Sequence, residues 1–172
     1  MQSWRNEVVQ SQFAEELTNE EVSASRAVSQ WATFDLAGET YGVNVMNIRE
    51  VLRHQNMTQV PGAPDFVEGI INLRGNVITI VNMRLRLGVR PADVSDMTRI
   101  MIAEVDDYTL GFVVDSVADV LDMDASQVDP SPSVNRGEVS NYIEGVTYVQ
   151  DELLILLDLK RIVLDDVDRY DL

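Results

Sequence analysis

The stretch Tyr41-Gly42-Val43-Asn44-Val45 decides the fold, because the chain repeats its pattern as Leu110-Gly111-Phe112-Val113-Val114. The two stretches align without a gap when position 41 is set on position 110. Each places a glycine second and surrounds it with residues that favour strands. Short runs of this kind between turn signals predict β-strands. The chain therefore offers the same strand twice.

The repetition extends well beyond these two stretches. At the same separation, residues 48–52 fall on residues 117–121 with similar types at four positions. After seven extra residues in the second half, Glu68-Gly69-Ile70 falls on Glu144-Gly145-Val146, and 77–81 falls on 153–157. This period is too long for a solenoid repeat. The duplication predicts two similar β-barrels of about seventy residues that share a core, because neither would bury much surface alone.

Turn signals and apolar alternation locate the expected elements. Strands are predicted at 31–36, 41–46, 69–73, 77–81, 99–105, 110–114, 117–123, 143–149 and 153–157. Asn47 is predicted to cap a short helix that runs to about His54, with Ile48, Val51 and Leu52 on one face. Two more helical segments are predicted, at 82–87 and from about Asp158.

The domain organisation follows from a change of texture near residue 31. Residues 1–30 are predicted to be an extension that is flexible or partly helical, since Val9, Phe13 and Leu17 recur every fourth residue. A partner-docking helix is the alternative for this segment. Residues 31–172 are predicted to form the folded domain, with a first barrel at 31–95 and a second at 96–160. A C-terminal helix and an acidic tail follow.

The composition excludes several classes of site. The chain has 172 residues, no cysteine and one histidine, so disulfides, thiolate catalysis and multi-histidine metal sites are impossible. The formal charge of −16 and the single lysine disfavour binding to nucleic acid or anionic lipid. No signal-peptide pattern or apolar run of membrane-spanning length occurs. The sequence predicts a soluble cytoplasmic protein without direct membrane insertion.

The charge is unevenly distributed along the chain. Residues 31–100 hold 7 basic and 7 acidic residues, whereas residues 101–172 hold 4 and 17. Two explanations stay open for the acidic second half. It is either a solvated surface that keeps the protein soluble, or a surface that selects a basic partner.

No catalytic constellation emerges from the sequence. Phosphate-binding glycine patterns are absent, and the start of a calcium loop at 122–124 lacks the glycine and glutamate that such a loop needs. Asp115 and Asp119 are interpreted as strand-end carboxylates rather than an acid–base pair. The sequence therefore predicts a binding protein, not an enzyme, with no cofactor and no metal site.

Several motifs resemble the CheW family, the coupling proteins of bacterial chemotaxis. They are the segments 34–45 and 48–52, the Asn72-Leu73-Arg74-Gly75 signature and the segment 113–121, in the family's order. The resemblance covers about residues 31 to 163. It implies a mainly β fold, with two SH3-like five-stranded β-barrels that share a hydrophobic core and carry short helices.

The resemblance also implies a function and partners. A CheW-like chain is expected to be an adaptor that couples the cytoplasmic tip of methyl-accepting chemoreceptors to the regulatory domain of the histidine kinase CheA. Further CheW copies in rings are possible partners, and recruitment to membrane-associated arrays is implied. The alternative is a scaffold of a non-flagellar chemosensory pathway that controls pili or second messengers.

Six positions match family residues at partner surfaces. Position by position, the resemblance implies receptor or kinase contacts for Ile48, Glu50, Gly69, Arg74, Val117 and Val120. Core packing is the alternative role for the three aliphatic residues, and a backbone requirement is the alternative for Gly69. Arg74 is harder to explain structurally, because the tip of a turn does not need an arginine.

Overall fold

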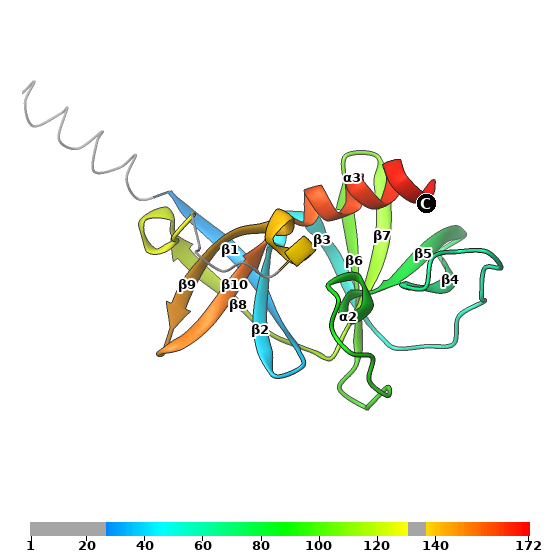
Figure 1. The fold of residues 1–172 in the computed structure, drawn as a ribbon, viewed down its shortest axis with the longest axis horizontal. Helices are drawn as coiled ribbons and strands as arrows, with labels where there is room; N and C mark the ends of the chain where they lie inside the picture. The colour runs from blue at the N-terminus through cyan, green and yellow to red at the C-terminus, as the bar shows by residue number, and fades with distance from the viewer. Residues whose placement is uncertain (1–26, 131–136) are drawn as a thin grey trace, which may run out of the picture.

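The computed structural model describes residues 27–130 and 137–172, and within them two five-stranded sheets stand side by side (Figure 1). Sheet A has the strand order β8-β1-β2-β10-β9, and sheet B has the order β3-β6-β7-β5-β4. The first five strands are β1 (Val28–Leu36), β2 (Glu39–Asn44), β3 (Ile48–Arg53), β4 (Val67–Leu73) and β5 (Asn76–Asn82). The other five are β6 (Arg99–Val105), β7 (Tyr108–Val114), β8 (Ser116–Asp124), β9 (Ile143–Val149) and β10 (Glu152–Leu157).

The duplication is visible in the strand order. Strands β6–β10 repeat β1–β5, and replacing each strand by its equivalent converts the order of one sheet into that of the other. Equivalent residues also pair alike: Trp31 faces Asn44 in sheet A, and Ile100 faces Val113 in sheet B. The two halves therefore build the same five-stranded unit.

Each sheet, however, takes strands from both halves of the chain. Sheet A combines β1 and β2 with β8, β9 and β10, while sheet B combines β6 and β7 with β3, β4 and β5. The sequence-based division into barrels at 31–95 and 96–160 is corrected by this exchange. Its cause is that the β2–β3 and β7–β8 connections each cross from one sheet to the other. The local strand pattern is the same in both repeats and did not reveal this crossing.

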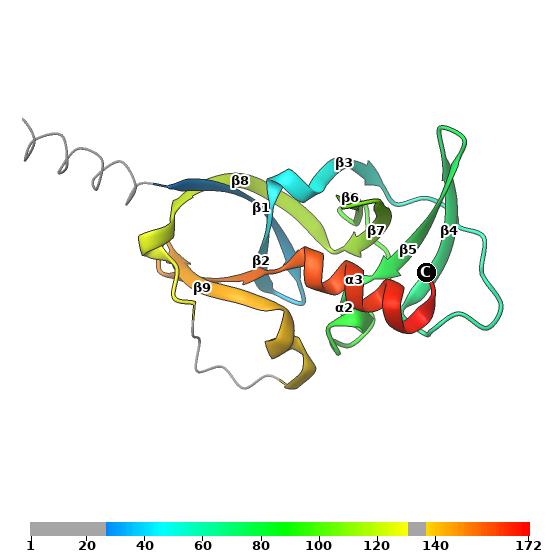
Figure 2. The same cartoon turned by 90° about the horizontal axis from the view of Figure 1, so that it is seen from above.

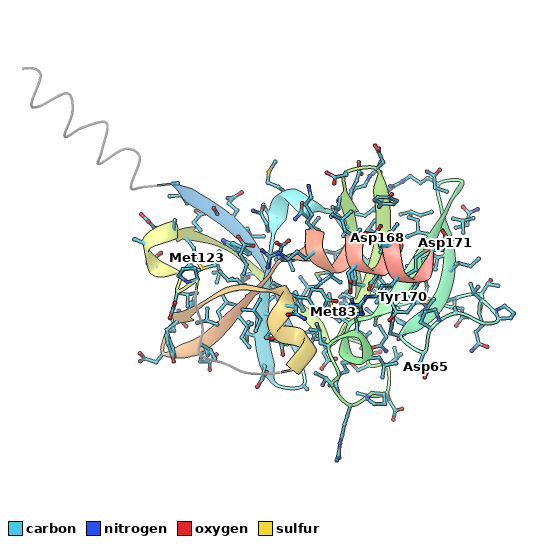
Figure 3. The ribbon with its side chains drawn as sticks, turned by 45° about the horizontal axis from the view of Figure 1, so that its top comes forward. Asp65, Met83, Met123, Asp168, Tyr170 and Asp171 are labelled. Carbon is cyan, nitrogen blue, oxygen red and sulfur yellow. The ribbon has the colours of Figure 1, made fainter. Side chains whose placement is uncertain are left out.

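Three apolar clusters fill the molecule. A six-residue cluster lies inside the barrel of sheet B: Ile71, Ile78, Ile80, Ile100, Ile102 and Val113. Trp31, Met123, Leu154 and Leu156 occupy the interior of the other barrel. The largest cluster joins both sheets and includes Phe34, Val81, Met83, Phe112 and Leu157. Figure 3 shows Met123 among the strands of sheet A and Met83 near the middle of the molecule. The predicted shared core is confirmed.

The segment after β2 differs from the sequence prediction. Instead of a helix from Asn47 to His54, a single 3-10 turn, η1 (Val45–Asn47), leads directly into β3. The cap is Asn44, whose side chain accepts a hydrogen bond from the Met46 amide at 2.9 Å. The apolar spacing in 48–52 suits a helix, but cross-strand pairing with β6 makes it a strand.

The N-terminal boundary also moves. Strand β1 begins at Val28 and pairs along β8, so residues 28–30 belong to the folded unit rather than to the predicted extension. The helix predicted around Val9, Phe13 and Leu17 lies outside the described residues.

The two predicted later helices are confirmed. Asn82 caps α2 (Met83–Arg86), and Asp158 caps α3 (Leu159–Tyr170), each by accepting a hydrogen bond from a backbone amide three residues on. In Figure 2, α3 runs from the end of β10 across to sheet B. At its far end Tyr170 meets the Phe66 ring edge-on at 5.0 Å.

A buried arginine ties α3 to α2. Arg86 is 6% exposed, and its guanidinium contacts Asp166 at 2.5 Å, Asp165 at 2.9 Å and the Tyr142 hydroxyl at 2.6 Å. It also stacks over the rings of Phe66 and Tyr142. Asp166 is fully buried, and one of its carboxylate oxygens has no hydrogen-bond partner among the described residues. This network fixes the C-terminal helix across the junction between the sheets.

Candidate functional site

Glu50 and Arg74 form the centre of the candidate site. Glu50 lies on the edge strand β3, and Arg74 lies in the turn between β4 and β5, so the pair joins the two edges of sheet B. The guanidinium donates two hydrogen bonds to the Glu50 carboxylate, at 2.7 and 3.0 Å. These bonds hold the pKa of Glu50 below its ordinary value. The structure thus brings together two of the predicted residues.

A shallow hollow of 320 Å³ opens beside this pair. Its wall combines β3, the β4–β5 hairpin and the β6–β7 turn, with Arg49 and Asp107 among the charged lining residues. Arg74 and Val77 are both about two-thirds exposed at its rim, at 68% and 67%. This end of the barrel therefore presents the Arg74–Glu50 ion pair next to the exposed side chain of Val77.

The turn that carries Arg74 has an unusual backbone. Arg74 has φ of 51° and Gly75 has φ of 85°, both in the left-handed region, and the Asn72 side chain accepts from the Gly75 amide at 2.9 Å. The equivalent turn in sheet A places Gln150 at the same φ of 51°, followed by Asp151. Since glutamine serves this turn equally well, the geometry does not require an arginine at position 74.

Ile48 and Val117 occupy equivalent positions in the two repeats. Both are half-buried, at the start of β3 and β8, and both pack against the shared core. Their burial supports the core-packing role and leaves only part of each side chain for a partner. Ile48 also borders a second hollow of 330 Å³, where Met46 is strongly exposed and Arg49 pairs with Glu104 at 3.0 Å.

Val120 differs from Ile48 and Val117 because it is exposed. It lies on β8, and its equivalent Val51 lies on β3 and is also exposed. The family resemblance points to Val120 but not to Val51, although the repeat aligns them. Val77 was missed as well, and its only signal is its place beside the turn. The exposed aliphatic residues of β3, β5 and β8 therefore form a larger set than the resemblance supplied.

Gly69 is buried rather than exposed. A Cβ at this position would lie 2.5 Å from the Thr58 carbonyl oxygen, and φ is 154°. The equivalent Gly145 also lies against backbone, with a Cβ that would lie 2.8 Å from the Asp129 carbonyl oxygen. In each repeat a bridging segment pairs alongside the edge strand. A close backbone contact therefore accounts for this glycine, and the structure gives it no exposed surface.

Asp115, one of the two carboxylates considered for catalysis, has a structural role. Asp115 forms an ion pair with Arg84 and accepts from the Ala37 amide at 2.9 Å, and the Arg84 hydrogen bonds lower its pKa.

Within residues 27–130 and 137–172, no group of three potential metal ligands occurs. No helix in that part of the chain is long and apolar enough to cross a membrane.

His54 follows β3 and is also structural. Its Nε2 lies 3.4 Å from a Glu68 carboxylate oxygen, and the other oxygen of Glu68 accepts from the Asn82 side chain at 2.6 Å. The histidine therefore joins β3 to β4 instead of ending a helix.

Comparison with known proteins agrees with this architecture. A model of the CheW-like domain matches residues 30–166. The chemotaxis protein CheW of Treponema pallidum is 34% identical over 137 residues, which cover 77% of this chain and 81% of that protein. CheW of Klebsiella aerogenes is 27% identical over 134 residues, covering 78% and 81%.

A solved structure has the same fold as this chain. The scaffolding protein TtCheW from Thermoanaerobacter tengcongensis superposes with a TM-score of 0.71 at 31% identity, covering 78% of this chain and 91% of that one. The predicted fold class of two SH3-like barrels is thereby confirmed. Since the family model spans most of the chain, the protein belongs to the CheW-like family of chemotaxis scaffold and adaptor proteins.

Proposed function

We propose that this protein is a non-enzymatic adaptor that couples chemoreceptors to the histidine kinase CheA. In this proposal it binds the cytoplasmic tip of methyl-accepting receptors and the regulatory domain of the kinase. It works in the cytoplasm, recruited to membrane-associated arrays, and further copies of the chain join it in rings. Nucleic acid binding and membrane insertion are not part of this role.

One observation carries the proposal: the exposed Arg74–Glu50 pair, at a turn that does not need an arginine. An exposed ion pair adds little to stability, at most about 1 kcal/mol. The equivalent turn with Gln150 has the same backbone conformation without such a pair. Selection for folding therefore does not explain Arg74, whereas recognition of a partner does. Arginine and oriented charge pairs are typical of interfaces, where they set specificity and docking geometry.

Aliphatic residues around the pair supply the apolar part of the proposed surface. Val77 on β5 and Val51 on β3 are exposed, and Ile48 begins the same strand as Glu50. An amphipathic receptor helix would lay its apolar stripe on such residues, while Glu50 and Arg74 fix its orientation. On β8, Val117 and Val120 would extend the contact from the second repeat.

The decisive experiment measures binding of the purified full chain to a receptor cytoplasmic fragment and to the CheA regulatory domain. The variant is Arg74→Glu, and the matched control is Gln150→Glu at the equivalent turn of sheet A. We expect Arg74→Glu to weaken receptor binding at least about tenfold while the control binds as the wild type does. Both variants should melt within a few degrees of the wild type.

Two results would contradict the proposal. The first is failure of well-folded wild-type protein to bind either partner. The second is a large drop in melting temperature for Arg74→Glu, which would assign the arginine a structural role.

A further inference from the structure

Two arginines, Arg53 and Arg99, lie side by side at the C-terminal end of β3, and the fold does not explain them. Antiparallel pairing of β3 with β6 sets Arg53 directly opposite Arg99. Directly opposed residues of an antiparallel pair project on the same face of the sheet, and like charges in this position destabilise the pair. Within residues 27–130 and 137–172, neither guanidinium has a carboxylate in an ion pair. The chain carries 29 acidic residues, so this unpaired juxtaposition is unexpected.

The two arginines line a hollow of 540 Å³. Its remaining wall consists of His54 and the segment before β6: Val94, Ser95, Asp96 and Thr98. Arg53 is exposed and Arg99 is half-buried. The hollow therefore has room for a small ligand and two cationic groups on one side.

The geometry of the loop before β6 holds one arginine in place. The Nη1 of Arg99 donates to the carbonyl oxygens of Asp96 and Thr98 at 2.7 and 2.9 Å. The Thr98 amide bonds the Ser95 carbonyl at 3.2 Å, which closes the turn. Among the residues that the structure describes, the Nε and Nη2 of Arg99 and the guanidinium of Arg53 have no hydrogen-bond partner. Such prior ordering lowers the entropic cost of binding.

The hydroxyl groups in this wall are also arranged as donors. The Thr98 hydroxyl accepts from the Ser95 amide at 2.9 Å, and the Ser95 hydroxyl accepts from the Met97 amide at 3.2 Å. A hydroxyl that accepts in this way keeps its own proton for donation. Asp96 is the one carboxylate among the described residues that line the hollow. Donors therefore outnumber acceptors here, which suits a ligand that only accepts.

We propose that Arg53 and Arg99 form a binding site for the phosphate group of a soluble molecule. Two guanidinium groups match the charge of a phosphate dianion, and each can donate two parallel hydrogen bonds to it. A carboxylate, with a single charge, would leave the repulsion between the arginines only half compensated. Arg53 ends β3, and the hollow that it lines shares no residue with the hollow beside the Arg74–Glu50 pair, so the site goes beyond the adaptor function.

The test is a two-dimensional NMR titration of the ¹⁵N-labelled full chain with inorganic phosphate at pH 7. A parallel titration with sodium chloride at equal ionic strength removes the effect of screening. We expect phosphate alone to shift the amides of the Ser95–Arg99 segment and of the end of β3. Arg53→Gln and Arg99→Gln should each weaken phosphate binding about tenfold. Asp96→Asn should strengthen it, because it removes the opposing charge.

Arg49→Gln is the matched control, since Arg49 lies on the same strand but is paired with Glu104. It should leave phosphate binding unchanged. Without phosphate, Arg53→Gln should also raise the melting temperature, because it removes the like-charge pair. Equal shifts with phosphate and chloride would overturn the proposal, as would phosphate binding that survives the double variant Arg53→Gln/Arg99→Gln.

A vesicle experiment separates a soluble phosphate from a lipid headgroup. Sedimentation with vesicles that contain phosphatidylglycerol should leave the protein in solution, because the net charge of −16 opposes approach to an anionic surface. Sedimentation without a response to free phosphate would overturn the assignment to a soluble ligand. Receptor and CheA binding should be the same for Arg53→Gln and wild type, so failure of this proposal and failure of the adaptor proposal are distinguishable.

Discussion

At the β4–β5 hairpin of sheet B, Arg74 forms an ion pair with Glu50. At the equivalent hairpin of sheet A, Gln150 replaces the arginine, and Asp119 is the equivalent of Glu50. The backbone has the same left-handed turn in both places. The duplication has therefore kept the scaffold and changed the chemical groups that it displays. Features present in both repeats serve the fold, and features present in one repeat are candidates for function.

The repeats also differ at the last residue of α2. Arg86 is buried there among Asp165, Asp166 and Tyr142, whereas the equivalent residue of the second repeat, Ile162, is buried in the apolar core. Removing the cation leaves Asp166 as a buried charge without its partner. We expect Arg86→Met to lower the free energy of unfolding by about 3–5 kcal/mol, measured by urea denaturation.

A second variant sharpens this prediction. Arg86→Met combined with Asp166→Leu replaces both charges and should recover much of the lost stability, because a well-packed apolar pair can replace a buried ion pair. A double variant as unstable as the single one would show that Arg86 acts through packing over the Phe66 and Tyr142 rings instead.

The same network makes stability depend on pH. Burial raises the pKa of Asp166 from 3.8 to about 6, against the opposing effect of Arg86. Between these values the folded state holds more protons than the unfolded chain. The contribution of Asp166 is therefore greatest below pH 4 and falls as pH rises through 6, by on the order of 2 kcal/mol.

Asp115 has the opposite dependence, since its pKa is lowered and its contribution to stability disappears as pH falls through the folded value.

Because of Asp166, we expect the free energy of unfolding to be higher at pH 5 than at pH 7, measured by urea denaturation. In Asp166→Asn this decline between pH 5 and 7 should be much smaller. A wild-type decline that the variant retains in full would assign the effect to another group.

The two buried glycines test a feature that the repeats share. Gly69→Ala brings a Cβ against the Thr58 carbonyl at a φ that disfavours side chains, and should cost about 1–3 kcal/mol. Gly145→Ala meets the Asp129 carbonyl oxygen at 2.8 Å and the end of the Val128 side chain at 2.5 Å, and its φ is not in the left-handed region. Because a side chain yields more easily than backbone, its cost should be smaller. Thermal melts of both variants check the order. A Gly69→Ala variant with native stability and impaired partner binding would return this position to the partner surface.

The smallest expected effect comes from transplanting the charge pair. Gln150→Arg offers Asp119 the partner that Glu50 has in the other repeat. It should add no more than about 0.5 kcal/mol, because the pair is exposed, and it should leave receptor binding unchanged. A gain in receptor affinity would show that the end of the sheet A barrel also contacts the partner.

The sequence predicted most of the fold because its signals are local. Strand positions, the turn at Arg74 and the helical segments that start near Asn82 and Asp158 follow from side-chain alternation and from residues that prefer particular backbone angles. The segment 48–52 was predicted as a helix, although its repeat at 117–121 was predicted as a strand. Equivalent segments should adopt one structure, so the repeat itself favours a strand at 48–52.

Local sequence signals could not predict the exchange of strands between the two sheets. Alternation says which face of a strand is apolar but not which strand lies beside it, and each repeat offers the same edges. Within the candidate site, Glu50 and Arg74 were predicted from the family motif, and their contact required the fold. The opposed arginines at positions 53 and 99 could not be predicted, because they are far apart in sequence and become neighbours only through the register of β3 and β6.

The exchange also sets an order of events during synthesis. Sheet B has all five of its strands once the ribosome has released the chain up to Val114, whereas sheet A must wait for β10, which ends at Leu157. Until then β2 lacks its neighbour β10, and Phe34 and Tyr41 lack the part of the core that β10 and α3 supply. The barrel that contains the N-terminal hairpin is therefore the last to be completed. A nascent chain stalled before residue 143 would present an unfinished sheet to chaperones.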